Sequence, residues 1–427
     1  MDDLKHALFV AFHYPPEASS SGVLRTLKYT RYLADYGWRV TIIAPREDAY
    51  EITDAKLTEQ VPSTARVIRT RFLNTKRHLS IRGIYPALFA VPDTWVGWLP
   101  WAVAAGRALF RSDPYDLIYS TSPHATAHLV ALRLAAFSRK PWVTDFRDPW
   151  YEDPPEPGAP TGRLYRWAER TLEQKVIRTC DRVVASTTQL RDLLQQRYPG
   201  EPREKILAIL NGYDEADFAS LSVAAPVNHD RLVMLHAGSI NSSFRDPRPL
   251  FAALRRAADR GDVDLDKICV RFVGGGGFAE SDEMRQSVKD LQLERAVEFL
   301  PRVAYDQSLL ELSRANVLLL LQASPDTANL IPAKLYEYLR TFRPVLALVC
   351  PGATAEVLAA TRGGWAIASE DARSLQDTIT EIYRLWLKGT LGDVRAQADV
   401  LRQFDRRALT GTLAAVFNEL AANVESG

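Results

Sequence analysis

The chain has 427 residues, a length typical of two or three domains, and 47% of them are apolar, which is enough to bury sizeable cores. Lys and Arg total 53 against 52 Asp and Glu, so the net charge is +1 and lacks the basic excess typical of nucleic-acid-binding proteins. The same balance, with so many apolar residues, argues against intrinsic disorder.

Short apolar runs alternate with segments of 3.6-residue periodicity along the whole chain. Runs rich in β-forming residues predict twelve strands, at Ala7–His13, Arg39–Pro45, Leu117–Thr121, Trp142–Phe146, Arg182–Ser186, Ile206–Leu210, Leu232–Ala237, Ile268–Gly274, Val297–Leu300, Val317–Leu321, Val345–Val349 and Trp365–Ala368. The periodic segments predict helices between them, among them Gly22–Gly37, Ala125–Ser138, Leu164–Thr179, Pro249–Arg260 and Asp306–Arg314. This alternation is typical of parallel α/β sheets, whose strands are buried on both faces.

About six strands in each half exceed one ordinary sheet, so we divide the chain into two doubly wound domains. A run of small and polar residues at 220–228 predicts the boundary, which gives domains over residues 1–225 and 226–404. An amphipathic helix at 405–427 could cap either domain, and we assign it to the first. Ligands of such domains bind beyond the carboxyl ends of the strands, so the loops there hold the candidate residues.

Neither a membrane segment nor a metal site is expected. The first apolar run ends at Pro15 and Pro16, too early for a secretion signal, and no uncharged apolar run reaches about 18 residues. The three cysteines form no CxxC pair, and the seven histidines have no HxxxH spacing. The acidic run at 262–266 precedes a strand, so we interpret it as a solvated loop. We therefore expect a soluble, cytoplasmic protein.

Three loops of the first half carry candidate residues. The turn that contains Ser21 and Gly22 precedes a helix, and its N–H groups could bind an anion or could form an ordinary helix cap. His124 follows the strand at 117–121 and could act as an acid or a base near neutral pH. Arg147 and Asp148 follow the next strand; they could be catalytic, or Asp148 could cap a turn and pair with an arginine.

In the second half, the loop after the strand at 232–237 contains Gly238 and Ser239, which permit close backbone approach, and Arg245. Arg245 could offer a bidentate contact to a phosphate, or it could be solvated. The run at 274–279 formally matches GxGxxG/A, but it follows the second strand of its domain, so we do not expect a nicotinamide cofactor. A loop that closes over a ligand fits this run as well.

The segment at 329–339 is the most informative. Pro332 suits the first turn of a helix, whose N-terminal N–H groups could bind a diphosphate. Lys334 would oppose the helix dipole unless an anion is present, and Glu337 could accept hydrogen bonds from a vicinal diol such as ribose. The alternative is a solvated Lys334 that pairs with Glu337 at i,i+3.

In this order and spacing, the chain resembles a family 4 glycosyltransferase, a retaining enzyme of the GT-B fold, over essentially its full length. The segments that carry the resemblance are HYPPEASSSGVLRTLKYTRYLADYGWRVTIIAP, SPHATAHLVALRLAAFSRKPWVTDFRDPW, CDRVVASTTQLRDLL, ILAILNGYDEADF, HAGS, RFVGGGG, VEFLPRV and IPAKLYEYLRTFRPVLAL. The resemblance implies two Rossmann-like domains that face each other across a cleft. It also implies that a nucleotide-diphosphate sugar, and no further cofactor, binds the second domain while the acceptor binds mostly the first.

The resemblance also implies roles for individual residues. Glu337 would hold the ribose, and Arg245 would neutralise the departing phosphate. Gly22 would let its loop approach the donor. The remaining donor-binding residues would be Gly238, Ser239, Asn329, Leu330, Ile331, Pro332, Ala333 and Lys334. Such enzymes are thought to use front-face attack, in which the protein supplies positioning and charge stabilisation.

Three positions depart from the family pattern. Asn329 replaces the first acid of E-x7-E, although its amide could still bond a sugar hydroxyl. Arg147 replaces the usual histidine, a role that His124 could take over. The usual basic pair is shifted, which leaves Arg245 as the candidate and Arg248 as the reserve.

Residues 66–111 contain eight basic residues and one acid beside aromatic runs. This segment could rest on anionic lipid at the inner face of a membrane, or its aromatic residues could belong to the core. We expect a transferase of the hexosyltransferase class that acts on a sugar, glycolipid or other small acceptor in cell-envelope or extracellular polysaccharide biosynthesis. The alternatives are a sugar-nucleotide epimerase or phosphorylase of the same fold, and a catalytically silent nucleotide-sugar-binding module.

Overall fold

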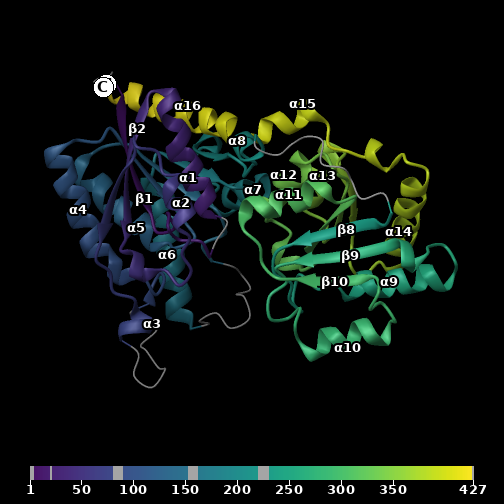
Figure 1. Ribbon diagram of the computed structural model, residues 1–427. Helices are drawn as coiled ribbons and strands as arrows, with labels where there is room; N and C mark the ends of the chain where they lie inside the picture. The colour runs from purple at the N-terminus through teal and green to yellow at the C-terminus, as the bar shows by residue number, and fades with distance from the viewer. Residues whose placement is uncertain (1–3, 20–21, 80–89, 152–161, 220–229, 426–427) are drawn as a thin grey trace. The chain divides into compact units, whose positions relative to one another are not determined.

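A computed structural model describes residues 4–19, 22–79, 90–151, 162–219 and 230–425 (Figure 1). The chain forms two compact units, one of Met1–Asn211 with Arg406–Gly427 and the other of Gly212–Asp405. In each unit the described strands form one parallel sheet with helices on both faces. Among the described helices, none combines the length and the hydropathy needed to cross a bilayer.

The sheet of the first unit has the strand order β3-β2-β1-β4-β5-β6-β7. Its described strands are β1 (Lys5–Ala11), β2 (Trp38–Pro45), β3 (Arg66–Thr70), β4 (Leu117–Thr121), β5 (Trp142–Phe146), β6 (Arg182–Ala185) and β7 (Ile206–Ala208). The edge strand β3 was not predicted, because its sequence RVIRT carries two arginines and does not read as an apolar run. An edge strand is only partly covered by neighbours, so it accommodates such side chains.

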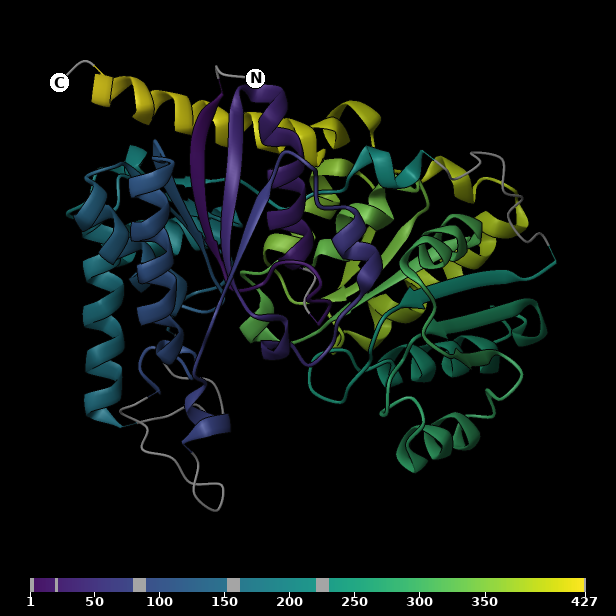
Figure 2. The same cartoon turned by 60° about the vertical axis from the view of Figure 1, so that its left-hand side comes forward.

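Helices cover both faces of this sheet. Leu8 and Val10 of β1 contribute to the core under α4, α5, α6 and α7, while Phe9 and Ala11 contribute to the core under α1 and α16. The helices of this unit are α1 (Gly22–Tyr32), α2 (Ala55–Glu59), α3 (Thr75–His78), α4 (Leu99–Ser112), α5 (Thr126–Ser138), α6 (Arg163–Thr179), α7 (Thr188–Arg197) and α16 (Arg406–Glu425). Figure 2 shows α6 as the long teal helix at the left edge of the molecule.

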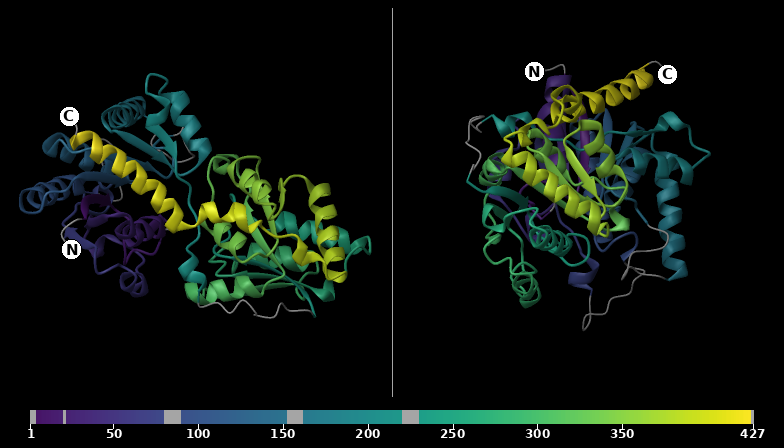
Figure 3. Two further views of the ribbon diagram at one scale, coloured as in Figure 1. Left: turned by 90° about the horizontal axis from the view of Figure 1, so that it is seen from above. Right: turned by 90° about the vertical axis from the view of Figure 1, so that its right-hand side faces the viewer.

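The C-terminal helix α16 packs on the sheet of the first unit. The ring of Phe417 lies 5.4 Å from that of Trp38 and 6.3 Å from that of Phe9. The Trp38 indole N–H donates to Asn418 Oδ1 at 2.9 Å. Seen from above, this yellow helix runs along the purple N-terminal elements (Figure 3).

The sheet of the second unit has the order β10-β9-β8-β11-β12-β13. Its described strands are β8 (Leu232–Ala237), β9 (Ile268–Val273), β10 (Val297–Leu300), β11 (Val317–Gln322), β12 (Val345–Val349) and β13 (Gly364–Ile367). Its helices are α8 (Glu215–Phe218), α9 (Arg248–Asp259), α10 (Asp282–Asp290), α11 (Tyr305–Arg314), α12 (Ala333–Arg340), α13 (Ala353–Thr361), α14 (Ala372–Leu387) and α15 (Ala398–Leu401). Each unit thus places the carboxyl ends of its parallel strands at one edge.

The units divide earlier in the chain than the sequence predicts, at Asn211 rather than within 220–228, a run that lies outside the described residues. The physical reason is that the segment after Gly212 packs on the second unit. The Tyr213 N–H donates to the Phe404 carbonyl at 3.1 Å, and Glu215 accepts from Arg340 Nε at 2.6 Å.

The aromatic residues described within 66–111 lie largely in the core. Trp98 is fully buried, and its indole donates to Thr70 Oγ1 at 2.7 Å. The ring of Trp95 lies 4.4 Å from that of Phe12, and Arg69 donates to the Pro45 carbonyl at 3.2 Å. Residues 80–89 of this segment lie outside the described residues. The core interpretation therefore holds for Trp95 and Trp98.

Candidate functional site

Three segments of the second unit meet beyond the carboxyl ends of β8 and β11. The Ala323 N–H donates to the Phe244 carbonyl at 2.8 Å, which joins the loop after β8 to the end of β11. Lys334 of α12 donates from Nζ to the Ala237 carbonyl at 2.7 Å, and the Ala237 N–H donates to the Tyr338 hydroxyl oxygen at 3.0 Å. The fold thus brings the loop after β8, with its predicted site residues, against the start of α12.

Gly238 is required at its position for two reasons. Its φ of +114° is in the region that favours glycine, and a Cβ built there would lie 2.7 Å from Lys334 Nζ. Its N–H donates to the Val273 carbonyl at 2.8 Å, so the turn is also anchored to β9. Gly238 therefore lets the Lys334 ammonium approach the backbone.

Arg245 and Lys334 are two cations that form no ion pair with any residue that the structure describes. Arg245 Nη1 donates to Ser239 Oγ at 3.1 Å, and its guanidinium lies 4.8 Å from the ring centre of Phe244. Among the described residues, no carboxylate lies within ion-pair distance of either cation. Arg248, the reserve candidate, is instead paired with Asp246 at 2.6 Å and with Glu283.

The pKa values of both cations reflect this lack of partners. Burial and, to a lesser extent, the neighbouring Arg245 together lower the pKa of Lys334 to about 8, against the opposing effect of Glu337. Burial also lowers the pKa of Arg245. Two partly desolvated positive groups beside each other are costly unless an anion binds between or near them, so the arrangement is suited to a phosphate.

The titration of Lys334 predicts a pH dependence of anion binding. With a pKa of about 8, the free protein loses this charge as the pH rises, whereas a bound diphosphate favours the charged form and raises the pKa. Above pH 8 the affinity for a diphosphate should fall by up to about tenfold per pH unit. Since unfolded lysine keeps its proton to about pH 10.4, stability should rise with pH between the two values.

Calorimetric titration with a nucleoside diphosphate from about pH 7 to about pH 9.5 measures this effect around the pKa of Lys334. The variant Lys334→Met has no ammonium and should bind weakly with little slope over the same range. An equal slope in Lys334→Met would show that another group titrates.

The start of α12 presents backbone N–H groups. Pro332 precedes the helix, and the first turn has neither an acidic residue nor a side-chain cap. Within the described part of the chain, the N–H groups of Ile331, Ala333 and Lys334 have no hydrogen-bond acceptor. Unpaired N–H groups of this kind and the helix dipole favour an anion.

The loop before α12 is held in place by polar side chains. The Leu330 carbonyl accepts from Gln322 Nε2 at 3.1 Å and from Thr354 Oγ1 at 3.0 Å, while the Leu330 N–H donates to Thr327. Ile331 is buried, whereas Asn329 is exposed. The structure therefore orders Leu330 to Pro332 and leaves the Asn329 side chain at the surface.

Glu337 has a partner that the sequence did not indicate. Tyr305, the first residue of α11, donates from its hydroxyl to Glu337 Oε1 at 2.9 Å, and the same hydroxyl lies 3.4 Å from Asp217 Oδ2. Lys334 bonds to Ala237 instead, so the i,i+3 ion pair considered above does not form. The carboxylate of Glu337 is thus oriented by a residue 32 positions away in the chain.

In the first unit, His124 lies in an aromatic cluster beyond β4. Its ring is 4.4 Å from that of Phe12 and 5.1 Å from that of His13. Burial lowers the pKa of His13 to about 2 and also lowers that of His124, and the nearby Arg147 acts in the same direction on both. Both imidazoles are therefore neutral at pH 7 and suited to hydrogen bonding with hydroxyl groups.

Arg147 and Gly22 lie in direct contact. A Cβ built on Gly22 would overlap the Arg147 guanidinium, which also donates from Nη1 to the Ser122 carbonyl at 3.1 Å. Burial raises the pKa of Asp148, against the opposing effect of Arg147. The space that Gly22 leaves open is thus filled by Arg147, while Ser21 lies outside the described residues.

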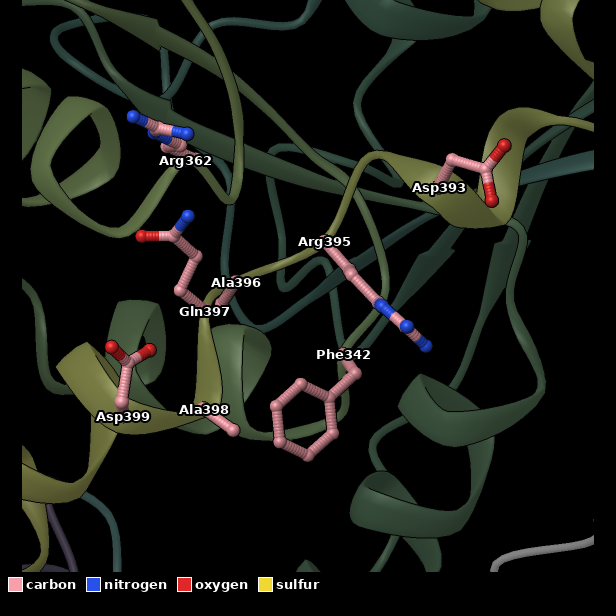
Figure 4. A pocket seen from close by; sticks show the side chains of 8 residues that line it. All are labelled: Phe342, Arg362, Asp393, Arg395, Ala396, Gln397, Ala398 and Asp399. Atoms are coloured by element: carbon pink, nitrogen blue, oxygen red, sulfur yellow. The ribbon is translucent and has the colours of Figure 1, made fainter.

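Another hollow of the second unit lies away from this site. It has a volume of about 670 Å³ and is bordered by the residues labelled in Figure 4, among them Phe342 and Arg362. These two precede β12 and β13, so the hollow is at the amino ends of the strands. Within the described residues, no group of three or more His, Cys, Asp or Glu side chains is placed to hold a metal ion.

Comparison with known proteins gives a family match and a set of similar structures. Residues 22–212 match the family described as "Glycosyl transferase 4-like domain". No curated protein matches the chain.

Three solved structures are similar over nearly the whole chain. The sucrose-phosphate synthase of Thermosynechococcus elongatus is 17% identical, covers 98% of this chain and 100% of its own, and has a TM-score of 0.64. Anabaena HepE, solved in complex with UDP-glucose, is 17% identical with coverages of 97% and 99% and a TM-score of 0.64. A glycosyltransferase of Rickettsia africae is 13% identical with coverages of 97% and 98% and a TM-score of 0.67. At these identities the likeness shows the fold.

Proposed function

We propose that this chain, which has the GT-B fold and whose residues 22–212 match the glycosyl transferase 4-like domain, is a glycosyltransferase that transfers a sugar from a nucleotide-diphosphate sugar to an acceptor hydroxyl with retention of configuration. The observation that carries this proposal is a pair of cations, Arg245 and Lys334, that have no carboxylate partner among the described residues and lie beside the N-terminal amides of α12. The complex of HepE with UDP-glucose supports a UDP-sugar as the first donor to test.

In this proposal the second unit holds the donor. The diphosphate accepts hydrogen bonds from the N–H groups of Ile331, Ala333 and Lys334 and from the two cationic side chains. Glu337 accepts from the ribose hydroxyls, and Tyr305 keeps its carboxylate oriented. Gly238, Ser239 and Leu330 shape the wall of the site.

The proposed reaction needs no nucleophile from the protein. The bond between the anomeric carbon and the leaving phosphate oxygen breaks, the acceptor oxygen bonds to the same face of that carbon, and the acceptor proton passes to the leaving phosphate. Negative charge grows on the diphosphate as the bond breaks. Arg245 and Lys334 stabilise this charge in a partly desolvated site, where such an interaction is strong.

We assign the acceptor to the first unit. The neutral imidazole of His124 exchanges hydrogen bonds with a hydroxyl, and Arg147 and Asp148 add one donor and one acceptor group to the same edge of the sheet. An acceptor that carries sugar hydroxyls, free or in a glycolipid of the cell envelope or an extracellular polysaccharide, fits these groups.

A donor screen tests the proposal. The protein is incubated with UDP-, GDP-, ADP- and dTDP-linked sugars and a panel of sugar and glycolipid acceptors, and nucleoside diphosphate release is measured. We expect release with at least one donor, and an α-linked product from an α-linked donor by NMR. Interconversion of epimeric sugar nucleotides would favour an epimerase, and binding without turnover would favour a silent binding module.

Glu337→Gln should weaken UDP binding by about 10- to 100-fold, because the amide no longer offers charge-assisted hydrogen bonds to the ribose. Tyr305→Phe should weaken it only severalfold, since the hydroxyl acts through Glu337. Calorimetric titration measures both. Inorganic pyrophosphate has no ribose, so its affinity should not change in Glu337→Gln; an equal loss for both ligands would contradict the ribose assignment.

A further inference from the structure

Helix α6 of the first unit turns its acidic residues inward. Glu173 is fully buried and accepts from Arg197 Nη1 at 2.9 Å and from the Tyr198 hydroxyl at 2.6 Å. Glu169 is half-buried, and burial raises its pKa to about 7. The outward face of the helix is thereby left without an acid.

That outward face combines large apolar side chains with cations. Leu164 and Trp167 are 62% and 63% exposed, the two highest values among the large apolar side chains that the structure describes. Four cationic residues of the same helix are also exposed: Arg163, Arg170, Lys175 and Arg178. No described carboxylate lies within ion-pair distance of Arg163, Lys175 or Arg178. We call these six residues the α6 face.

We propose that the α6 face docks on an anionic lipid surface. Trp and Leu side chains favour the boundary between headgroups and acyl chains, and adjacent Arg and Lys side chains are attracted to anionic headgroups. The net charge of the whole chain is only +1, so this run of cations is a local feature.

The α6 face differs from the segment at 66–111 that the sequence suggested for this role. Trp98 of that segment is buried in the core and Trp101 is 38% exposed, whereas Trp167 is 63% exposed. Docking through the α6 face would bring the first unit to a lipid-linked acceptor. The presence of such an acceptor rests on the proposed function, whereas the docking itself does not.

Vesicle flotation tests the docking without any sugar transfer. The full chain is mixed at low salt with vesicles of phosphatidylcholine, or of phosphatidylcholine and phosphatidylglycerol, and the bound fraction is measured. We expect binding to the anionic vesicles only, and release at high salt. Leu164→Ser with Trp167→Ser should lower partitioning at least about tenfold, and Arg163→Gln with Lys175→Gln about fivefold per charge.

Matched controls come from the second unit. Leu387→Ser removes an apolar side chain that is 57% exposed on α14, and Arg285→Gln with Arg373→Gln removes two exposed charges. Both should float like the unchanged protein, and thermal unfolding checks that each variant folds. The proposal is overturned if the unchanged protein does not float with anionic vesicles, or if the α6 variants match the controls. It is also overturned if sedimentation shows a dimer that Trp167→Ser dissociates without lipid.

Discussion

Arg245→Gln is expected to lower kcat/KM for sugar transfer by about 10²- to 10³-fold, the usual loss when one group that stabilises transition-state charge is removed. Arg245 contacts Ser239 Oγ and the ring of Phe244, and no carboxylate of the described residues lies within ion-pair distance of it. Since burial already lowers its pKa, the neutral variant should unfold with an unchanged or slightly higher free energy. Initial rates at several donor concentrations measure the loss.

Arg248→Gln is the matched control for this prediction. Arg248 lies three residues away, but its charge is paired with Asp246 and Glu283 and is not free to act on a ligand. We expect nearly normal rates and a loss of at most about 1 kcal/mol in unfolding free energy, because these ion pairs are partly exposed. Equal losses of activity in the two variants would remove Arg245 from its proposed role.

Arg25→Met is expected to destabilise the protein by about 3–5 kcal/mol, since it leaves a buried carboxylate without its counterion. Arg25 donates to Asp145 from Nε at 3.1 Å and from Nη2 at 2.8 Å, and both residues are fully buried. Arg25 also donates to the carbonyls of Ile209 and Leu210, the two residues that precede Asn211, where the first segment of this unit ends. Urea denaturation, followed by tryptophan fluorescence, measures the change.

The pKa of Asp145 adds a pH dependence to this ion pair. Burial opposes ionisation of Asp145, but Arg25 and the hydrogen bonds around the carboxylate outweigh it, so the pKa is below its ordinary value. The stabilisation is therefore complete above an unfolded pKa of about 4 and is lost as the pH falls through the folded value. Adding Asp145→Asn to Arg25→Met should recover part of the loss at neutral pH, and no recovery would contradict the charge explanation.

Most strands could be located from the sequence, because a parallel strand that is buried on both faces consists of a continuous run of apolar residues. The runs at 117–121, 142–146, 232–237, 297–300 and 345–349 have the predicted bounds in the structure. Strand β3 could not be recognised in this way, because an edge strand tolerates arginines. The start of α12 was also predictable, since Pro332, Lys334 and Glu337 form a local pattern.

Interactions between distant parts of the chain were beyond the reach of such patterns. Arg245 and Arg248 both lie near Asp246 in the sequence, but the fold pairs Asp246 with Arg248 and brings Glu283 of α10 to the same arginine. The Tyr305 hydroxyl donates to Glu337, 32 residues away in the chain. Arg197 forms an ion pair with the buried Glu173, 24 residues away. The pattern of apolar residues shows which faces of each strand and helix are buried, so this pattern is enough to specify the two parallel sheets. Which charges remain unpaired depends on long-range packing, and these charges are what the proposed site uses.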